Sequence, residues 1–177
     1  MKTRAFLPIL LVAGVMIACG KTTFTQVDLY GLVYQNGDLP EYGSAPGLRP
    51  VKEKMDWTYD NWVQVQVFNK ENSADLLVDV VLFSDKKELE KAYAEFPNGV
   101  LQETMSPFDP PEIGEKIVGK KQEWSLNTYA VNWTFTRCYS LVNIWAQIGG
   151  RSPFTEEGIR TYAQALDKRL NNSVCPI

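Results

Sequence analysis

Histidine is absent from this chain of 177 residues, and several kinds of active site are excluded with it. Without imidazole there can be no Ser-His-Asp triad, no Cys-His dyad, no HExxH zinc site and no histidine-ligated haem. The chain also has no Gly-rich phosphate loop and no cluster of residues with metal-ligand spacing. We therefore expect no cofactor and no metal ion.

A surplus of basic residues is also missing. The chain has 18 Lys and Arg against 21 Asp and Glu, for a formal net charge of −3. A general nucleic-acid binder usually carries a basic surplus, so we expect no nucleic-acid partner.

Long hydrophobic runs are scarce, and the longest lies at the N-terminus. Lys2 and Arg4 precede a run of 14 apolar residues from Ala5 to Ala18. This length is typical of a signal-peptide core and is short for a membrane-spanning helix, which needs about 20 residues. We therefore predict that residues 1–18 are a signal peptide.

The end of this run carries the most specific motif in the sequence. The residues Met16-Ile17-Ala18-Cys19 resemble the lipobox of bacterial lipoproteins, in which a small residue precedes a lipidated cysteine. The resemblance implies that a diacylglyceryl group is attached to Cys19 and that residues 1–18 are then removed. It also implies an extracytoplasmic protein, anchored by lipid to the bacterial cell membrane or outer membrane. Residues 19–24 would form a lipidated tether.

Cysteine is rare, and the count of three supports the same interpretation. If Cys19 carries lipid, Cys138 and Cys175 remain as an even pair, which favours a disulfide outside the cytoplasm. A strand from Tyr139 to Ile148 and a returning helix from Glu156 to Leu170 would bring Cys175 back near Cys138. We predict a Cys138–Cys175 disulfide, the alternative being two free thiols.

Residues 25–177 are predicted to form a single α+β domain, with a mostly antiparallel sheet and two amphipathic helices packed on one face of it. Alternating or continuous apolar residues predict the main strands, at residues 25–34, 63–67, 76–83, 129–136 and 139–148. Shorter strands are expected at residues 117–118 and near Trp124. Residues 35–50 and 104–112 are rich in Gly or Pro and are predicted to be loops.

The two helices are predicted from caps and from apolar spacing. Asp85 is a candidate N-cap, and the apolar residues that follow it recur with the period of one helix face, ending at Phe96. Thr155 is the N-cap expected for the second helix, with Glu156 and Glu157 in its first turn.

Aromatic residues are the main candidates for an interaction surface. Trp57, Tyr59 and Trp62 flank a loop rich in Gly and Pro, and Trp145 lies on the less apolar face of its strand. Exposed aromatic rings can stack on sugar rings or hold a protein partner. The alternative is that these rings pack in the core, which is the more frequent location of large aromatic side chains.

Two groups of charged residues are further candidates for a site. Asp109, Glu112 and Glu115 could form a carboxylate pair or a calcium site, but the usual calcium spacing is absent and a solvated loop is favoured. A small basic patch beside Trp124 could contact lipid headgroups, although a solvated strand edge is favoured. Its residues are Lys116, Lys120 and Lys121.

The sequence therefore predicts a membrane-anchored envelope lipoprotein with a non-enzymatic domain that binds a protein, a glycan or a small ligand. One alternative is an accessory or structural subunit of a larger membrane complex. Another is a secreted soluble protein, or a small enzyme working without histidine, such as a hydrolase using carboxylates.

Overall fold

The computed structural model describes residues 28–39, 47–52, 54–68, 74–96 and 104–175. The predictions for the signal peptide, for Cys19 and for the tether fall on residues 1–27 and lie outside the described residues. Within the described ranges, none of the helices combines the length and hydrophobicity that crossing a bilayer requires.

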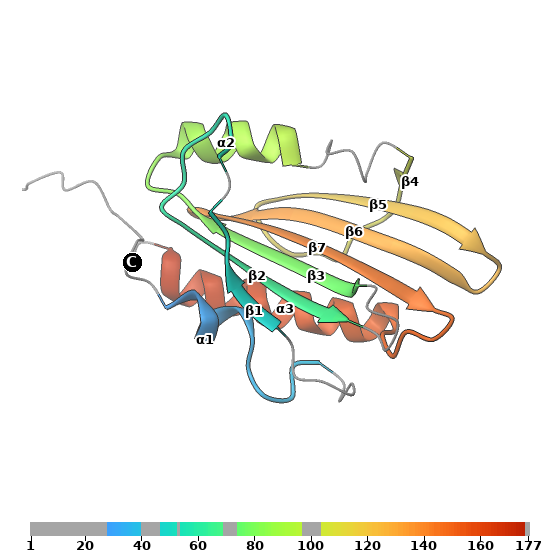
Figure 1. The fold of residues 1–177 in the computed structure, drawn as a ribbon. Helices are drawn as coiled ribbons and strands as arrows, with labels where there is room; N and C mark the ends of the chain where they lie inside the picture. The colour runs from blue at the N-terminus through green and yellow to red at the C-terminus, as the bar shows by residue number, and fades with distance from the viewer. Residues whose placement is uncertain (1–27, 40–46, 53, 69–73, 97–103, 176–177) are drawn as a thin grey trace, which may run out of the picture.

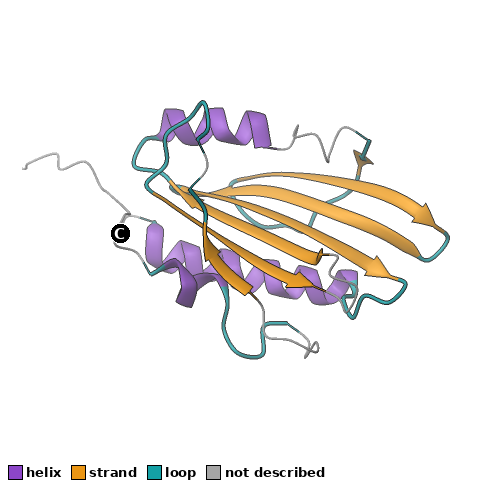
Figure 2. Ribbon diagram, in the orientation of Figure 1, coloured by secondary structure: helices purple, strands orange, loops and turns teal. Residues whose placement is uncertain are grey.

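One antiparallel sheet forms the centre of the domain (Figure 1, Figure 2). Its strands lie in the order β1-β2-β3-β7-β6-β5-β4, so β3 and β7 are central. The predicted α+β class with a mostly antiparallel sheet is confirmed. In chain order the elements are α1 (Leu29–Val33), β1 (Gly47–Pro50), β2 (Asn61–Phe68), β3 (Ala74–Leu82), α2 (Lys86–Glu95), β4 (Ser106–Pro107), β5 (Lys116–Ser125), β6 (Thr128–Arg137), β7 (Ser140–Gly149) and α3 (Glu156–Val174).

The main core lies between one face of the sheet and helices α1 and α3. Helix α3 contributes an apolar stripe at helical spacing, which includes Ile159, Leu166 and Leu170. The sheet contributes alternate residues of its four central strands, because successive side chains on a strand point to opposite faces. These are Val63, Val65, Val67, Leu76, Val78, Val80, Leu82, Val131, Trp133, Phe135, Val142, Ile144, Ala146 and Ile148.

Helix α2 packs on the opposite face, which differs from the expectation that both helices share one face. Figure 1 shows α2 on one side of the sheet and α3 on the other. The side chains beneath α2 come from the alternate set of strand positions, such as Val81 and Leu141, and contact Leu89 and Ala92 of the helix. A helix pattern shows that one stripe is apolar but does not show which sheet face it will cover.

The N-terminal segment also differs from its prediction. A strand was expected at residues 25–34, whereas the described part of this segment forms the short helix α1. Its N-cap is Asp28, whose side chain accepts hydrogen bonds from the backbone N–H groups of Tyr30 and Gly31. Tyr162 holds this helix on α3, because its hydroxyl donates to the carbonyl oxygen of Val33 at 2.8 Å.

Helices α2 and α3 begin at the N-caps that the sequence predicts. Asp85 caps α2 by accepting from the N–H of Lys87, and Thr155 caps α3 by accepting from the N–H of Gly158. Helix α3 continues past the predicted end at Leu170 as far as Val174. The segments predicted as loops contain two short edge strands, β1 and β4.

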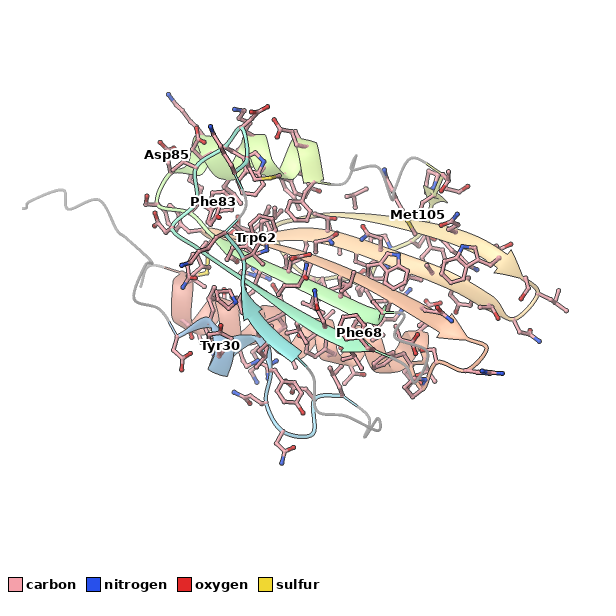
Figure 3. The ribbon with its side chains drawn as sticks, in the orientation of Figure 1. Tyr30, Trp62, Phe68, Phe83, Asp85 and Met105 are labelled. Carbon is pink, nitrogen blue, oxygen red and sulfur yellow. A yellow bond between two sulfur atoms is a disulfide. The ribbon has the colours of Figure 1, made fainter. Side chains whose placement is uncertain are left out.

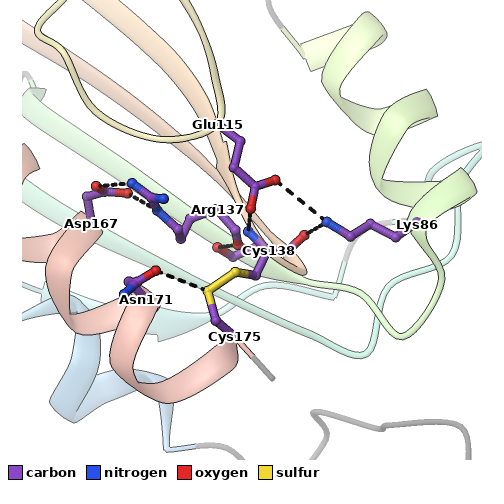
Figure 4. Close-up of a disulfide and its surroundings, with 8 residues drawn as sticks. Lys86, Glu115, Arg137, Cys138, Asp167, Asn171 and Cys175 are labelled. Atoms are coloured by element: carbon purple, nitrogen blue, oxygen red, sulfur yellow. Dashed lines mark hydrogen bonds and ion pairs between the residues drawn. A yellow bond between two sulfur atoms is a disulfide. The ribbon is translucent and has the colours of Figure 1, made fainter. Parts of the chain in front are cut away.

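The C-terminal end of α3 is fixed to the turn between β6 and β7 (Figure 4). Cys138 lies in this turn with a φ of 53° and forms a disulfide with Cys175, as predicted. Beside it, the guanidinium of Arg137 donates two hydrogen bonds to the carboxylate of Asp167, at 2.7 and 2.6 Å. Glu115 accepts from the N–H of Cys138 at 3.0 Å. The helix end is thus held by covalent and ionic links together.

Candidate binding surface

Helix α2 covers only one end of its sheet face (Figure 1). The strand register places a second set of side chains on the same face, farther towards the β5–β6 turn. We call this set the open face. Its members are Gln66, Leu77, Lys120, Gln122, Trp124, Asn132, Trp145 and Gln147.

A polar row separates the open face from the apolar cluster beneath α2. Gln64, Asp79, Asn143 and Thr134 lie opposite one another on β2, β3, β7 and β6. Asp79 Oδ1 accepts from the side-chain amide of Gln64 at 2.7 Å. It also accepts from the indole N–H of Trp62 at 2.9 Å. The row therefore joins the aromatic cluster to the polar part of the sheet.

The row continues across β7 and β6 through a small amide network. Asn143 Oδ1 accepts from Asn132 Nδ2 and from Thr134 Oγ1, both at 2.9 Å. All three residues are buried. Because buried polar groups are costly to leave unpaired, these bonds hold the strands in one register and make the floor of the open face rigid.

Two tryptophan side chains meet on the open face. The ring centroids of Trp124 and Trp145 lie 6.3 Å apart with an interplanar angle of 46°. Trp145 is half-buried, and Trp124 is 47% exposed. Leu126, in the turn just beyond Trp124, is 98% exposed. The two indoles lie next to each other at the surface, and Trp124 is the more exposed of the two.

Uncharged amides flank the aromatic pair. Gln147 and Gln122 lie on either side of Ala130 in the strand register, on β7 and β5. Both side chains are partly exposed. Among the described residues, neither side-chain amide has a hydrogen-bond partner in the protein. Their donors and acceptors are therefore available to a ligand beside the two indoles.

Titratable side chains near the β4–β5 edge form ion pairs and hydrogen bonds with one another. Lys121 forms an ion pair with Glu123 at 2.9 Å, and its ammonium lies 4.1 Å from the ring centroid of Tyr129. The Tyr129 hydroxyl donates to Glu156 at 3.1 Å. Burial, followed by this hydrogen bond, raises the pKa of Tyr129. A raised pKa keeps the phenol protonated at neutral pH, which makes it a poor general base.

The predicted aromatic candidates divide between core and surface. Figure 3 shows Trp62 and Phe83 beneath α2. Trp57 and Trp62 are buried, with their ring centroids 5.8 Å apart, and Trp57 also packs against Phe83 and half-buried Tyr59. These positions match the alternative of core packing for the Trp57–Trp62 segment. Trp145, by contrast, lies on the open face.

The acidic candidates of the Pro-rich segment have separate surroundings. Asp109 and Glu112 are exposed. Glu115 forms an ion pair with Lys86 at 3.7 Å, near the disulfide. Within the described ranges there is no group of three or more Asp, Glu or Cys side chains placed to hold a metal ion.

The lysines of the predicted basic patch also have individual roles. Lys116 pairs with Glu90 of α2, and Lys121 pairs with Glu123. Lys120 lies on the open face, opposite Asn132 in the register. These residues occupy β5, close to one edge of the sheet, which is the location favoured by the sequence.

Sequence reasoning missed the pairing of Trp124 with Trp145. The signal for it was weak, because the register shifts between Glu123 and Ser125 and interrupts the alternation around Trp124. The sequence does place Trp145 on the less apolar face of its strand, which indicates that its ring is near the surface. The partner ring could be found only once β5, β6 and β7 were aligned.

No family model matches the sequence, and no curated protein matches it. Among solved structures, the domain is similar to the extracellular domain of PknH from Mycobacterium tuberculosis, with a TM-score of 0.37 and 14% sequence identity. The match covers 63% of this chain and 64% of that one. A likeness of this size carries no inference about the function of the chain.

Proposed function

We propose that this protein is a lipid-anchored, non-enzymatic binding domain of the bacterial cell envelope, and that the open face is its binding surface. The observation that carries the proposal is the Trp124–Trp145 pair, which lies on the sheet face beyond α2. Solvent-reachable tryptophans on a rigid sheet are typical of recognition surfaces, because they supply large contact areas at low entropic cost.

The proposed location rests on two features. The Met16–Cys19 motif resembles a lipobox, and Cys138 is joined to Cys175. Disulfides persist in oxidising compartments and are rare in the cytoplasm, which supports an extracytoplasmic domain. The non-enzymatic part of the proposal is supported by the interactions of Lys121, which pairs with Glu123 and lies over the ring of Tyr129. These groups are occupied with one another rather than directed at a substrate.

The anchor is tested by the intact mass of the protein extracted from bacterial membranes with detergent. We expect a mass lacking residues 1–18 and increased by acyl chains. The variant Cys19→Ala should lose both changes. A wild-type protein that is recovered from the aqueous fraction without acyl chains would disprove the anchor.

Binding is tested by photo-crosslinking in cells that express the full chain. A benzophenone amino acid is placed at Leu126, beside the open face, or at Gln164, which is exposed on α3. We expect adducts of defined mass from position 126 and none from position 164. Equal yields from both positions, or none from either, would contradict the open face as the binding surface.

A further inference from the structure

The chemistry of the open face indicates the class of its ligand. We infer, on the basis of the proposed binding function, that the open face binds an uncharged glycan, with a sugar ring stacked on the indole of Trp145 or Trp124. The inference rests on the kinds of side chain that the strand register brings together around the aromatic pair.

The first argument is the geometry of the two rings. The face of an indole carries a negative quadrupole, and the C–H groups on one side of a sugar ring carry small positive charges, so the two surfaces attract. The ring centroids of Trp124 and Trp145 lie 6.3 Å apart and the ring planes are inclined by 46°, so both indoles lie within reach of a single sugar ring. One sugar ring can lie flat on one indole while its edge contacts the other.

The second argument is charge complementarity. Of the eight residues that define the open face, only Lys120 is charged, and the remainder are amide, aromatic or aliphatic. Asp79, the nearest carboxylate in the polar row, is buried and accepts from Trp62 and Gln64. A surface of this composition offers no cluster of cations for a phosphate or carboxylate polymer. It suits a ligand whose polar groups are neutral.

The third argument is the supply of hydrogen bonds beside the rings. The amides of Gln122 and Gln147 each offer two donors and an acceptor oxygen, and neither group is used within the described protein. Sugar hydroxyls both donate and accept, so adjacent hydroxyls can bond to one amide in two ways. The hydrogen bonds among Asn132, Thr134 and Asn143 are already made. They hold β6 and β7 in register beneath the two glutamines.

A protein partner fits the same surface less well. A stable protein interface buries about 800 Å² on each side and has a contiguous apolar centre. Here the apolar side chains of the open face and its turn are the two indoles, Leu77 and Leu126, and amides flank the rings. The partner of this surface is therefore expected to be narrow, as a glycan chain is.

The experiment is affinity electrophoresis of the purified full chain in detergent. Native gels contain dextran, mannan, galactomannan or hydroxyethylcellulose as neutral polymers, or alginate as an anionic one. We expect at least one neutral polymer to retard the protein and alginate to leave it unaffected. Retardation by alginate alone, or by none of the polymers, would overturn the inference.

Matched variants connect any retardation to the open face. Trp124→Ala and Trp145→Ala should each weaken binding about tenfold or more, as for other stacked rings. Trp145→Phe keeps a ring and should retain part of the affinity, which guards against a folding defect in Trp145→Ala. Gln147→Ala should weaken binding several-fold. The control is Tyr30→Ala, which removes an exposed aromatic from α1 and should change nothing. Equal losses in the control and the tryptophan variants would contradict the site.

The two proposals fail in different ways. If photo-crosslinking from Leu126 yields protein adducts while no neutral polymer retards the chain, the binding function stands and the glycan assignment fails. If neither experiment gives a signal, both fail.

Discussion

The indole N–H of Trp62 on β2 donates a hydrogen bond to Oδ1 of Asp79 on β3, across 2.9 Å. Trp62 belongs to the aromatic cluster beneath α2, and Asp79 belongs to the polar row that borders the open face. This bond therefore connects the packing of a helix to the position of the open face. A change at Asp79 should disturb both.

We predict that Asp79→Ala destabilises the domain by about 2–4 kcal/mol, because two donors, Trp62 and Gln64, lose their acceptor and the indole N–H of Trp62 is buried. The matched control is Gln64→Ala, which leaves the Trp62–Asp79 bond in place and should cost about 1 kcal/mol. Denaturant unfolding followed by tryptophan fluorescence measures both. Equal effects of the two variants would show that the Trp62 bond contributes nothing.

Removal of the disulfide should lower stability by about 3–4 kcal/mol on the chain-entropy model, since its cysteines are 37 residues apart. The double variant Cys138→Ser, Cys175→Ser and the reduced wild type should unfold at the same denaturant concentration. A variant as stable as the oxidised protein would mean that Arg137–Asp167 and the packing of α3 suffice to hold the helix end.

Stability should fall in alkaline solution. Burial raises the pKa of Tyr162 far above its ordinary value of 10.0, and that of Tyr129 is raised as well. The unfolded tyrosines therefore lose their protons first as the pH rises. The contribution is fully present below pH 10 and is lost as the pH rises above it towards the folded pKa.

Urea unfolding between pH 8 and pH 11.5 checks this expectation, with tyrosinate absorbance as a second signal. Tyr162→Phe keeps the ring and removes the ionisable group, so its stability should decline less steeply above pH 10. An unchanged slope in this variant would assign the alkaline loss to other groups.

Gly149 is predicted to be intolerant of any side chain. Its φ is 80°, and a Cβ there would lie 1.8 Å from the carbonyl oxygen of Asn127 in the β5–β6 turn. Gly37 has a φ of 92° with no atom within 4 Å of a Cβ, and it serves as the control. Gly37→Ala should cost about 1–2 kcal/mol from backbone strain alone. Gly149→Ala should cost clearly more in thermal unfolding, and similar losses for both would show that the turn moves aside.

Much of the architecture could be predicted because it is recorded in local patterns. Alternation at Val63, Val65 and Val67, and the caps Asp85 and Thr155, are properties of short segments. The Cys138–Cys175 disulfide followed from element lengths. The short helix α1 could not be predicted in this way, because Asp28 fits a polar position of a strand as well as it fits a helix N-cap.

The placement of α2 required information that one helix does not contain. A signal was present in β3, where Val80, Val81 and Leu82 are all fully buried. A strand with apolar residues on both faces must be covered on both faces, so it indicated a second helix layer. The open face depends on residues from β2, β3, β5, β6 and β7, and its composition emerges only from their register.

The Cys138–Cys175 link also closes residues 138–175 into a covalent ring that contains all of β7 and α3. A protease that cuts the backbone once inside this ring, for example after exposed Arg151, would leave the two pieces joined. The nicked protein would keep its mass on a gel until a reducing agent was added. A domain built in this way can be cleaved once at this site without shedding its C-terminal helix, as long as the disulfide is intact.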